Sequence, residues 1–137
     1  MQFGRWSMAS YVLDTTVLID FVAGKARAVS LVNELADGQH ELCTCCICVA
    51  ELYSGLSAGA TGVADQLINS IAYLDVMPDQ ARLAGSIRYQ YARRGISLST
   101  TDTIVAAVAI ANDATLVTAN VRDFPMKELR LLELPSN

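Results

Sequence analysis

The stretch Tyr11-Val-Leu-Asp14-Thr-Thr-Val-Leu-Ile-Asp20 decides the fold of this 137-residue chain. Its first part, from Tyr11 to Asp14, is a short apolar run of β-forming residues that ends in a carboxylate. From Thr15 to Val22 the apolar residues recur at helical spacing. We therefore expect a strand that passes directly into a helix, with Asp14 at the junction.

Short apolar strands and amphipathic helices alternate along the rest of the chain. The expected strands are Tyr11–Asp14, Glu41–Cys46, Asp75–Pro78, Thr115–Thr118 and Arg130–Leu134. The expected helices are Thr15–Val22, Ala26–Ala36, Ile47–Leu56, Val63–Leu74, Asp79–Arg94 and Ser99–Asn112. This alternation predicts an α/β domain with a mainly parallel central sheet.

Composition favours one folded domain. Hydrophobic residues make up 53% of the chain and charged residues 18%, which allows a real core and argues against disorder. We expect a poorly structured extension over residues 1–10 and a single domain over 11–137. The most apolar stretch, Ile104 to Ala111, is far shorter than the roughly 20 residues of a membrane span. No signal peptide is visible, so a cytoplasmic protein with no membrane contact is expected.

Carboxylates follow the predicted strands or begin the helices after them. Asp14 ends the first strand, Glu51 lies one turn into the helix after the second, and Asp102 lies near the start of a uniformly apolar helix. Asp123 and Asn120 share the loop after Thr118. Parallel topology brings the carboxyl ends of strands to one edge of the sheet. Clustered carboxylates repel one another unless a cation neutralises them, and their oxygens suit Mg²⁺ or Mn²⁺.

Each of these residues also has a structural interpretation when it is taken alone. Asp14 can cap the helix that follows it. Asp102 fits position N3 of a capping box that starts at Ser99. Glu51 can be an ordinary solvated side chain, and Asp123 can belong to a polar turn. The catalytic interpretation rests on their joint placement.

Four segments in this order resemble the PIN-domain ribonucleases, and among them the VapC-type toxins of type II toxin–antitoxin pairs. The segments are Val12–Asp20, Val49–Leu52, Asp102–Ala107 and Leu116–Phe124. The resemblance extends from about Tyr11 to Glu133. It implies a three-layer α/β/α fold and Mg²⁺- or Mn²⁺-dependent endonucleolytic cleavage of RNA. It also implies neutralisation by a cognate VapB-type antitoxin, and homodimerisation.

The resemblance assigns roles by position. Asp14, Glu51 and Asp102 match the acidic triad, and Thr16 and Thr118 match supporting hydroxyl groups. The fourth acid is open between two positions: members of the family often have Asp where this chain has Asn120. We favour Asp123 as the fourth acid and Asn120 as a neutral ligand or orienting group, because an amide cannot serve as a base.

The charge of the chain is −4, which is unlike a general nucleic-acid binder. A local basic rim would reconcile this charge with an RNA substrate. The candidates for contacts with RNA phosphates are Arg88, Arg93, Arg94 and Arg122, with Lys25 and Arg27 as further ones. A solvated helix face explains Arg93 and Arg94 equally well. The single histidine, His40, excludes a mechanism based on a pair of imidazoles.

Four cysteines lie between Cys43 and Cys48, a pattern that could indicate a zinc site or a redox site. Zinc ligands usually come as spaced pairs from separate segments, and no second cluster exists here. Small buried hydrophobic side chains are the favoured interpretation.

Two other functions compete with the ribonuclease. The first is a non-catalytic binding module of the same fold. The second is a phosphate-handling receiver or phosphatase-like domain in which Asp14 is the nucleophile. That second class needs a lysine beside the site, and the chain has only Lys25 and Lys127.

Overall fold

A parallel β-sheet forms the centre of the computed structural model, which describes residues 9–136. The strands are β1 (Ser10–Leu13), β2 (Glu41–Cys45), β3 (Ala72–Leu74), β4 (Thr115–Thr118) and β5 (Arg130–Glu133). They are ordered β3-β2-β1-β4-β5, and every neighbouring pair is parallel. The expected parallel sheet is confirmed. The extension expected over 1–10 falls mainly on residues outside the described ones, and β1 already begins at Ser10.

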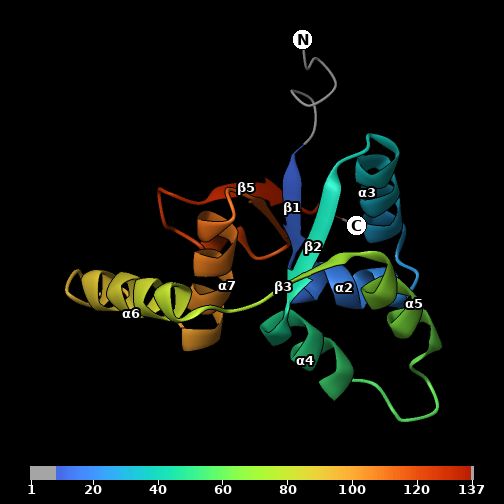
Figure 1. The fold of residues 1–137 in the computed structure, drawn as a ribbon, viewed down its shortest axis with the longest axis horizontal. Helices are drawn as coiled ribbons and strands as arrows, with labels where there is room; N and C mark the ends of the chain where they lie inside the picture. The colour runs from blue at the N-terminus through green and yellow to red at the C-terminus, as the bar shows by residue number, and fades with distance from the viewer. Residues whose placement is uncertain (1–8, 137) are drawn as a thin grey trace.

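Helices cover both faces of the sheet (Figure 1). They are α2 (Thr15–Val22), α3 (Ala26–Asp37), α4 (Cys46–Ser54), α5 (Gly62–Ser70), α6 (Pro78–Ala92), α7 (Thr100–Ala111) and the 3₁₀ turn η1 (Val121–Asp123). Helices α6 and α7 lie on one side, and α2, α3 and α5 on the other. The three-layer α/β/α architecture is therefore confirmed. No helix in the described part is long and apolar enough to cross a membrane.

The strand order reverses beside the central strand β1. From β1 the chain builds outward through β2 to β3, and it then returns to the other side of β1 with β4 and β5. Ligands of open parallel sheets bind beyond the carboxyl ends of the strands where the order reverses. Here that point lies between Leu13 of β1 and its register partner Val117 of β4. The residues directly after these two strands therefore face a common space.

The expected helix over Val63–Leu74 is present but ends four residues earlier than predicted, and the expected strand over Asp75–Pro78 is wrong. The helix α5 ends at Ser70, and Ala72–Leu74 forms the edge strand β3, paired with Cys43–Cys45 of β2. A short apolar run suits either structure, and the free edge of β2 decides in favour of the strand. Pro78 opens helix α6 instead of ending a strand, because proline at the first helical position loses no hydrogen bond.

Helix α7 runs through the middle of the fold. Its side chains at Thr103 and from Val105 to Ala109 are all buried, which the uniformly apolar sequence predicted. The helix packs against α6, α4 and β4. Its first turn, which carries Asp102, is thus fixed by the core behind it.

A buried hydrogen bond links strands β1 and β2. The Thr44 hydroxyl donates to the Leu13 carbonyl at 3.1 Å, and Thr44 has no solvent exposure. We predict that Thr44→Val lowers the free energy of unfolding by about 1 kcal/mol, measured by urea denaturation, because the shape is kept and the bond is lost. Thr115→Val, at a partly exposed position in β4, is the control and should change it by less than about 0.5 kcal/mol. Equal effects of the two substitutions would contradict this assignment.

Candidate active site

Asp14 is the first residue after β1, and its carboxylate is buried. Its backbone N–H donates to the Val117 carbonyl at 3.0 Å, which extends the β1–β4 ladder by one bond. The Thr118 hydroxyl donates to Asp14 Oδ2 at 2.7 Å. Asp14 occupies the N-cap position of α2, but its side chain makes no capping hydrogen bond to that helix. The carboxylate is therefore aimed at the end of β4 and not at the helix.

The second oxygen of Asp14 lacks a strong partner. The Cys48 thiol donates to Oδ1, with its sulfur 3.9 Å away. Burial raises the pKa of Asp14 above its ordinary value, and the negative charges of Asp102 and Glu51 raise it further. The hydrogen bond from the Thr118 hydroxyl and the nearby Thr15 backbone N–H oppose this shift. A buried carboxylate in this position gains from a nearby cation.

Glu51 reaches the site from helix α4. Its Oε1 accepts a hydrogen bond from the Thr15 hydroxyl at 2.5 Å, so the carboxylate is held at the start of α2, beside Asp14. The side chain is otherwise exposed. The structure thus gives Glu51 a fixed partner, which an ordinary solvated glutamate does not have.

Asp102 lies in the first turn of α7. Its backbone N–H donates to the Ser99 hydroxyl at 3.1 Å, so the Ser99 half of the expected capping box is present. Burial raises the pKa of Asp102, and the charges of Asp123 and Glu51 raise it further, against the hydrogen bond from Ser99. The cap and a role for the carboxylate in metal binding are therefore compatible.

The loop after β4 is tied to the start of α2. The Ala119 backbone N–H donates to the Thr16 hydroxyl at 3.1 Å, and the Asn120 N–H donates to the Thr118 hydroxyl at 3.0 Å. Asn120 precedes the turn η1, and Asp123 is its last residue. Both side chains are exposed. Thr16 therefore fixes the loop against the start of α2, and Thr118 fixes both the loop and the Asp14 carboxylate.

Four carboxylates influence one another electrostatically. The charges of Asp102 and Glu51 raise the pKa of Asp14, and those of Asp123 and Glu51 raise the pKa of Asp102. Within residues 9–136, no three Asp, Glu, His or Cys groups lie close enough to hold a metal ion as they stand. The donor set nevertheless fits a hard divalent cation, since it consists of oxygens and Asp14 Oδ1 has only a thiol as partner. Such an ion would draw the mutually repelling carboxylates together.

The candidate RNA-contacting arginines lie in different settings. Arg122 belongs to η1, directly beside Asp123. Arg88 donates from Nε to the Leu98 carbonyl at 2.8 Å, next to the loop that opens α7. The guanidinium groups of Arg93 and Arg94 lie over the Tyr89 and Tyr91 rings, 5.6 and 4.2 Å from the centroids.

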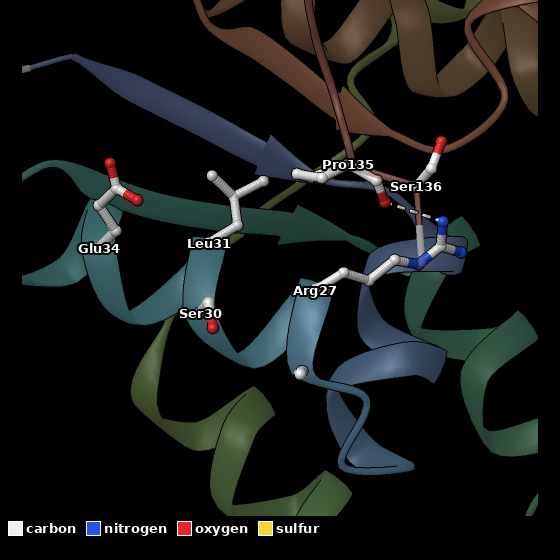
Figure 2. Close-up of a pocket in the computed structure, with 7 residues that line it drawn as sticks. Arg27, Ser30, Leu31, Glu34, Pro135 and Ser136 are labelled. Atoms are coloured by element: carbon white, nitrogen blue, oxygen red, sulfur yellow. Dashed lines mark hydrogen bonds between the residues drawn. The ribbon is translucent and has the colours of Figure 1, made fainter.

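Lys25 and Arg27 are engaged elsewhere. Both pair with the buried Asp20, with nitrogen–oxygen distances of 3.6 and 2.7 Å. Arg27 also donates to the Pro135 carbonyl at 3.1 Å, in a pocket between α3 and the C-terminal residues (Figure 2). None of the candidate active-site carboxylates lines this pocket. It is therefore separate from the acidic cluster.

Two residues that lie beside the carboxylates were not predicted to belong to the site. Thr15 holds Glu51, and Cys48 contacts Asp14. Cys48 lies three residues before Glu51, which places both on one face of α4. The three-residue spacing from Glu51 is the sequence feature that could have predicted Cys48 beside the site. For Thr15, the only such feature is its position next to Asp14.

Comparison with known proteins gives one family. A sequence model described as the PIN domain matches residues 11–128. Ribonuclease VapC19 of Mycobacterium tuberculosis is 32% identical over 117 residues, covering 84% of this chain and 92% of the relative. Ribonuclease VapC2 of Haemophilus influenzae is 27% identical over 122 residues, covering 85% and 91%.

Solved structures share the fold. VapBC2 from Rickettsia felis, bound to a DNA fragment from its promoter, aligns with a TM-score of 0.82 and 22% identity, covering 92% of this chain and 99% of that one. DNA-bound VapBC from Salmonella typhimurium aligns with a TM-score of 0.80 and 24% identity, covering 93% and 100%.

Proposed function

This chain belongs to the PIN-domain family, among the VapC ribonucleases, and from that membership we propose that it is a divalent-metal-dependent endoribonuclease acting as the toxin of a toxin–antitoxin pair. The observation that carries the proposal is the buried Asp14 carboxylate, whose pKa is raised by burial and by the charges of Asp102 and Glu51. Such a cluster is costly without a cation and useful with one.

Asp14 and Asp102 would hold the ion, Mg²⁺ or Mn²⁺, with Asn120 as a neutral oxygen ligand. When bound, the ion lowers the pKa of water and offsets negative charge on a phosphate. Glu51 and Asp123 border the same space and are the groups that accept a proton from an attacking water or orient it. Thr118 and Thr15 fix the carboxylates of Asp14 and Glu51 by hydrogen bonds.

The substrate enters over an acidic centre with basic residues at its rim. Arg122 next to Asp123, and Arg88 beside the loop before α7, are best placed to contact phosphates near the cluster. Arg93 and Arg94 lie at the end of α6 and would contact the backbone further along. Lys25 and Arg27 are less suited to this role, because both already pair with Asp20.

The partners follow from the family. The solved structures that share this fold include VapBC complexes, and we propose a VapB-type antitoxin as the partner that neutralises the activity. Homodimerisation is part of the same proposal, because a second copy would extend the basic rim.

The receiver or phosphatase-like alternative requires a lysine beside Asp14, and neither lysine of the chain meets this requirement. Lys25 is the N-cap residue of α3 and pairs with Asp20, and Lys127 is exposed between η1 and β5. Neither lysine forms an ion pair with the Asp14 carboxylate, whose oxygens face Thr118 and Cys48. A non-catalytic module of the same fold would bind no Mn²⁺ at millimolar concentration, and titration of the purified protein distinguishes it.

The fourth acid can be tested directly. We expect RNA cleavage with Mg²⁺ or Mn²⁺ and none with excess chelator. Asp123→Asn should lower the cleavage rate by about 10²-fold, since it removes a carboxylate from the cluster. Asn120→Ala should have a smaller effect, because it removes a neutral ligand. Cleavage that persists in chelator overturns the proposal, and a larger loss with Asn120→Ala reverses the assignment of the two positions.

A further inference from the structure

A groove of about 280 Å³ lies between helix α6 and the loop that leads into α7. Its lining residues come from one face of the helix and from that loop: Gly85, Arg88, Tyr89, Ala92, Ser97 and Leu98. The loop ends at Ser99, whose hydroxyl accepts a hydrogen bond from the Asp102 backbone N–H at 3.1 Å. One wall of the groove is therefore continuous with the turn that carries a carboxylate of the acidic cluster.

We propose that this groove binds an unpaired nucleobase of the RNA, stacked against the Tyr89 ring, with Arg88 at a neighbouring phosphate. The inference rests on the proposed ribonuclease function, since it assigns one nucleotide of that substrate to a place beside the acidic cluster. Proteins bind unpaired bases by stacking them on aromatic rings, and basic side chains follow the backbone. The groove offers both kinds of group on adjacent residues of one helix.

Tyr89 is an exposed aromatic residue whose ring is already held in place. Its exposed fraction is 62%. Arg93 Nη1 donates to the Tyr89 hydroxyl oxygen at 3.2 Å, and the Arg93 guanidinium carbon lies 5.6 Å from the ring centroid. A ring that is fixed before binding loses little conformational freedom when a base stacks on it. Tyr89 is therefore preorganised as a stacking surface.

Three arginines between positions 88 and 94 lack carboxylate partners. Arg88, Arg93 and Arg94 form no ion pair with any residue of 9–136, where the ion pairs involve other cations. The Arg88 Nε donates to the Leu98 carbonyl at 2.8 Å, which holds the side chain against the loop. Unpaired positive charge gathered on one helix of a chain with net charge −4 indicates an anionic ligand.

Gly85 keeps the groove open. Glycine inside a helix lowers stability relative to alanine, yet Gly85 lies in the middle of α6. A Cβ placed on Gly85 would meet no atom within 4 Å beyond the adjoining helix backbone. Packing of the described chain therefore does not require glycine here, and a larger side chain at this position would occupy the groove without disturbing the core.

A second copy of this chain is the other candidate occupant of the groove. In a two-fold contact the same surface faces itself, so the arginines of one copy would approach those of the other. Like charges placed opposite each other weaken such a contact, whereas RNA phosphates complement them. The charge of this surface therefore favours RNA.

The test measures RNA binding by the full-length protein in chelator, where metal-dependent cleavage does not run. The probes are single-stranded oligoribonucleotides in which each position in turn carries 2-aminopurine, a base whose fluorescence is quenched by stacking. We expect the protein to quench the probe at one position. Tyr89→Ala should abolish that quenching and lower the affinity about tenfold, and Tyr89→Phe should retain both. Tyr73→Ala, which alters an exposed tyrosine of β3, is the matched control and should bind as the wild type does.

Gly85→Leu separates binding from folding. It should raise the midpoint of thermal denaturation, because leucine is the better helix former, and should lower the RNA affinity about tenfold by filling the groove. RNA affinity that is unchanged in both Tyr89→Ala and Gly85→Leu overturns the inference and leaves the proposed function standing. Sedimentation that shows either variant changing from dimer to monomer also overturns it, and assigns the groove to a second copy. A wild-type protein that neither binds nor cleaves RNA would refute the proposed function, and this inference with it.

Discussion

Asp14→Asn will abolish RNA cleavage and will leave the metal-free protein at least as stable as the wild type. The loss of activity should be about 10³-fold, because the substitution removes the most buried carboxylate from the proposed metal site. Stability is retained because the asparagine oxygen can still accept from the Thr118 hydroxyl, while a buried negative charge disappears. Cleavage of a labelled RNA with Mn²⁺, and urea denaturation at pH 7 in chelator, measure the two effects.

Asp20→Asn is the matched control for this prediction. Asp20 is also buried and also follows β1, but it pairs with Arg27 and Lys25. Its substitution should lower the free energy of unfolding by about 1 to 3 kcal/mol, because two cations lose their partner, and should leave cleavage by the folded protein intact. Full activity of Asp14→Asn would end the proposal, and a large loss of stability would show that Asp14 is a structural residue.

The contrast between these two aspartates marks a limit of the sequence. Both lie in the same stretch, six residues apart, among apolar neighbours. Periodicity located the strand and the helix, and the strand-end rule located Asp14. The partners of Asp20 come from the turn after α2 and from α3, and no local pattern predicts which basic side chains turn back towards it. The sequence therefore left Lys25 and Arg27 among the candidates for RNA contacts.

The same limit explains the wrong elements. The Thr15–Val22 helix and the Thr115–Thr118 strand agree with the prediction residue for residue, because each is bounded by residues that end its pattern. Between Leu67 and Leu74 the apolar residues satisfy helical and extended periods alike. Only the free edge of β2, a tertiary feature, distinguishes the two. The contact of Cys48 with Asp14 is tertiary in the same sense, and it was missed for the same reason.

The stability of the protein should depend on pH in opposite directions with and without a bound metal ion. The pKa values of Asp14 and Asp102 are raised in the folded protein, so the folded state binds these protons more tightly than the unfolded chain does. In chelator, the contribution of these groups to the free energy of unfolding is fully present below about pH 4. It is lost as the pH rises through the folded pKa values. Each group contributes a slope of at most about 1.4 kcal/mol per pH unit, and Asp14 dominates because Asp102 is more exposed to solvent.

With Mn²⁺ present, the contribution of these carboxylates to stability should rise with pH, because the ion binds their deprotonated form and competes with protons. At a hundred times its dissociation constant, Mn²⁺ should add about 2.7 kcal/mol to the free energy of unfolding, and this gain should grow between pH 4 and 7. Thermal denaturation across this range, with Mn²⁺ and with chelator, measures both curves. Asp14→Asn should flatten the chelator curve and lose most of the Mn²⁺ gain. If Mn²⁺ stabilises that variant as strongly as the wild type, the ion binds elsewhere and Asp14 is no ligand.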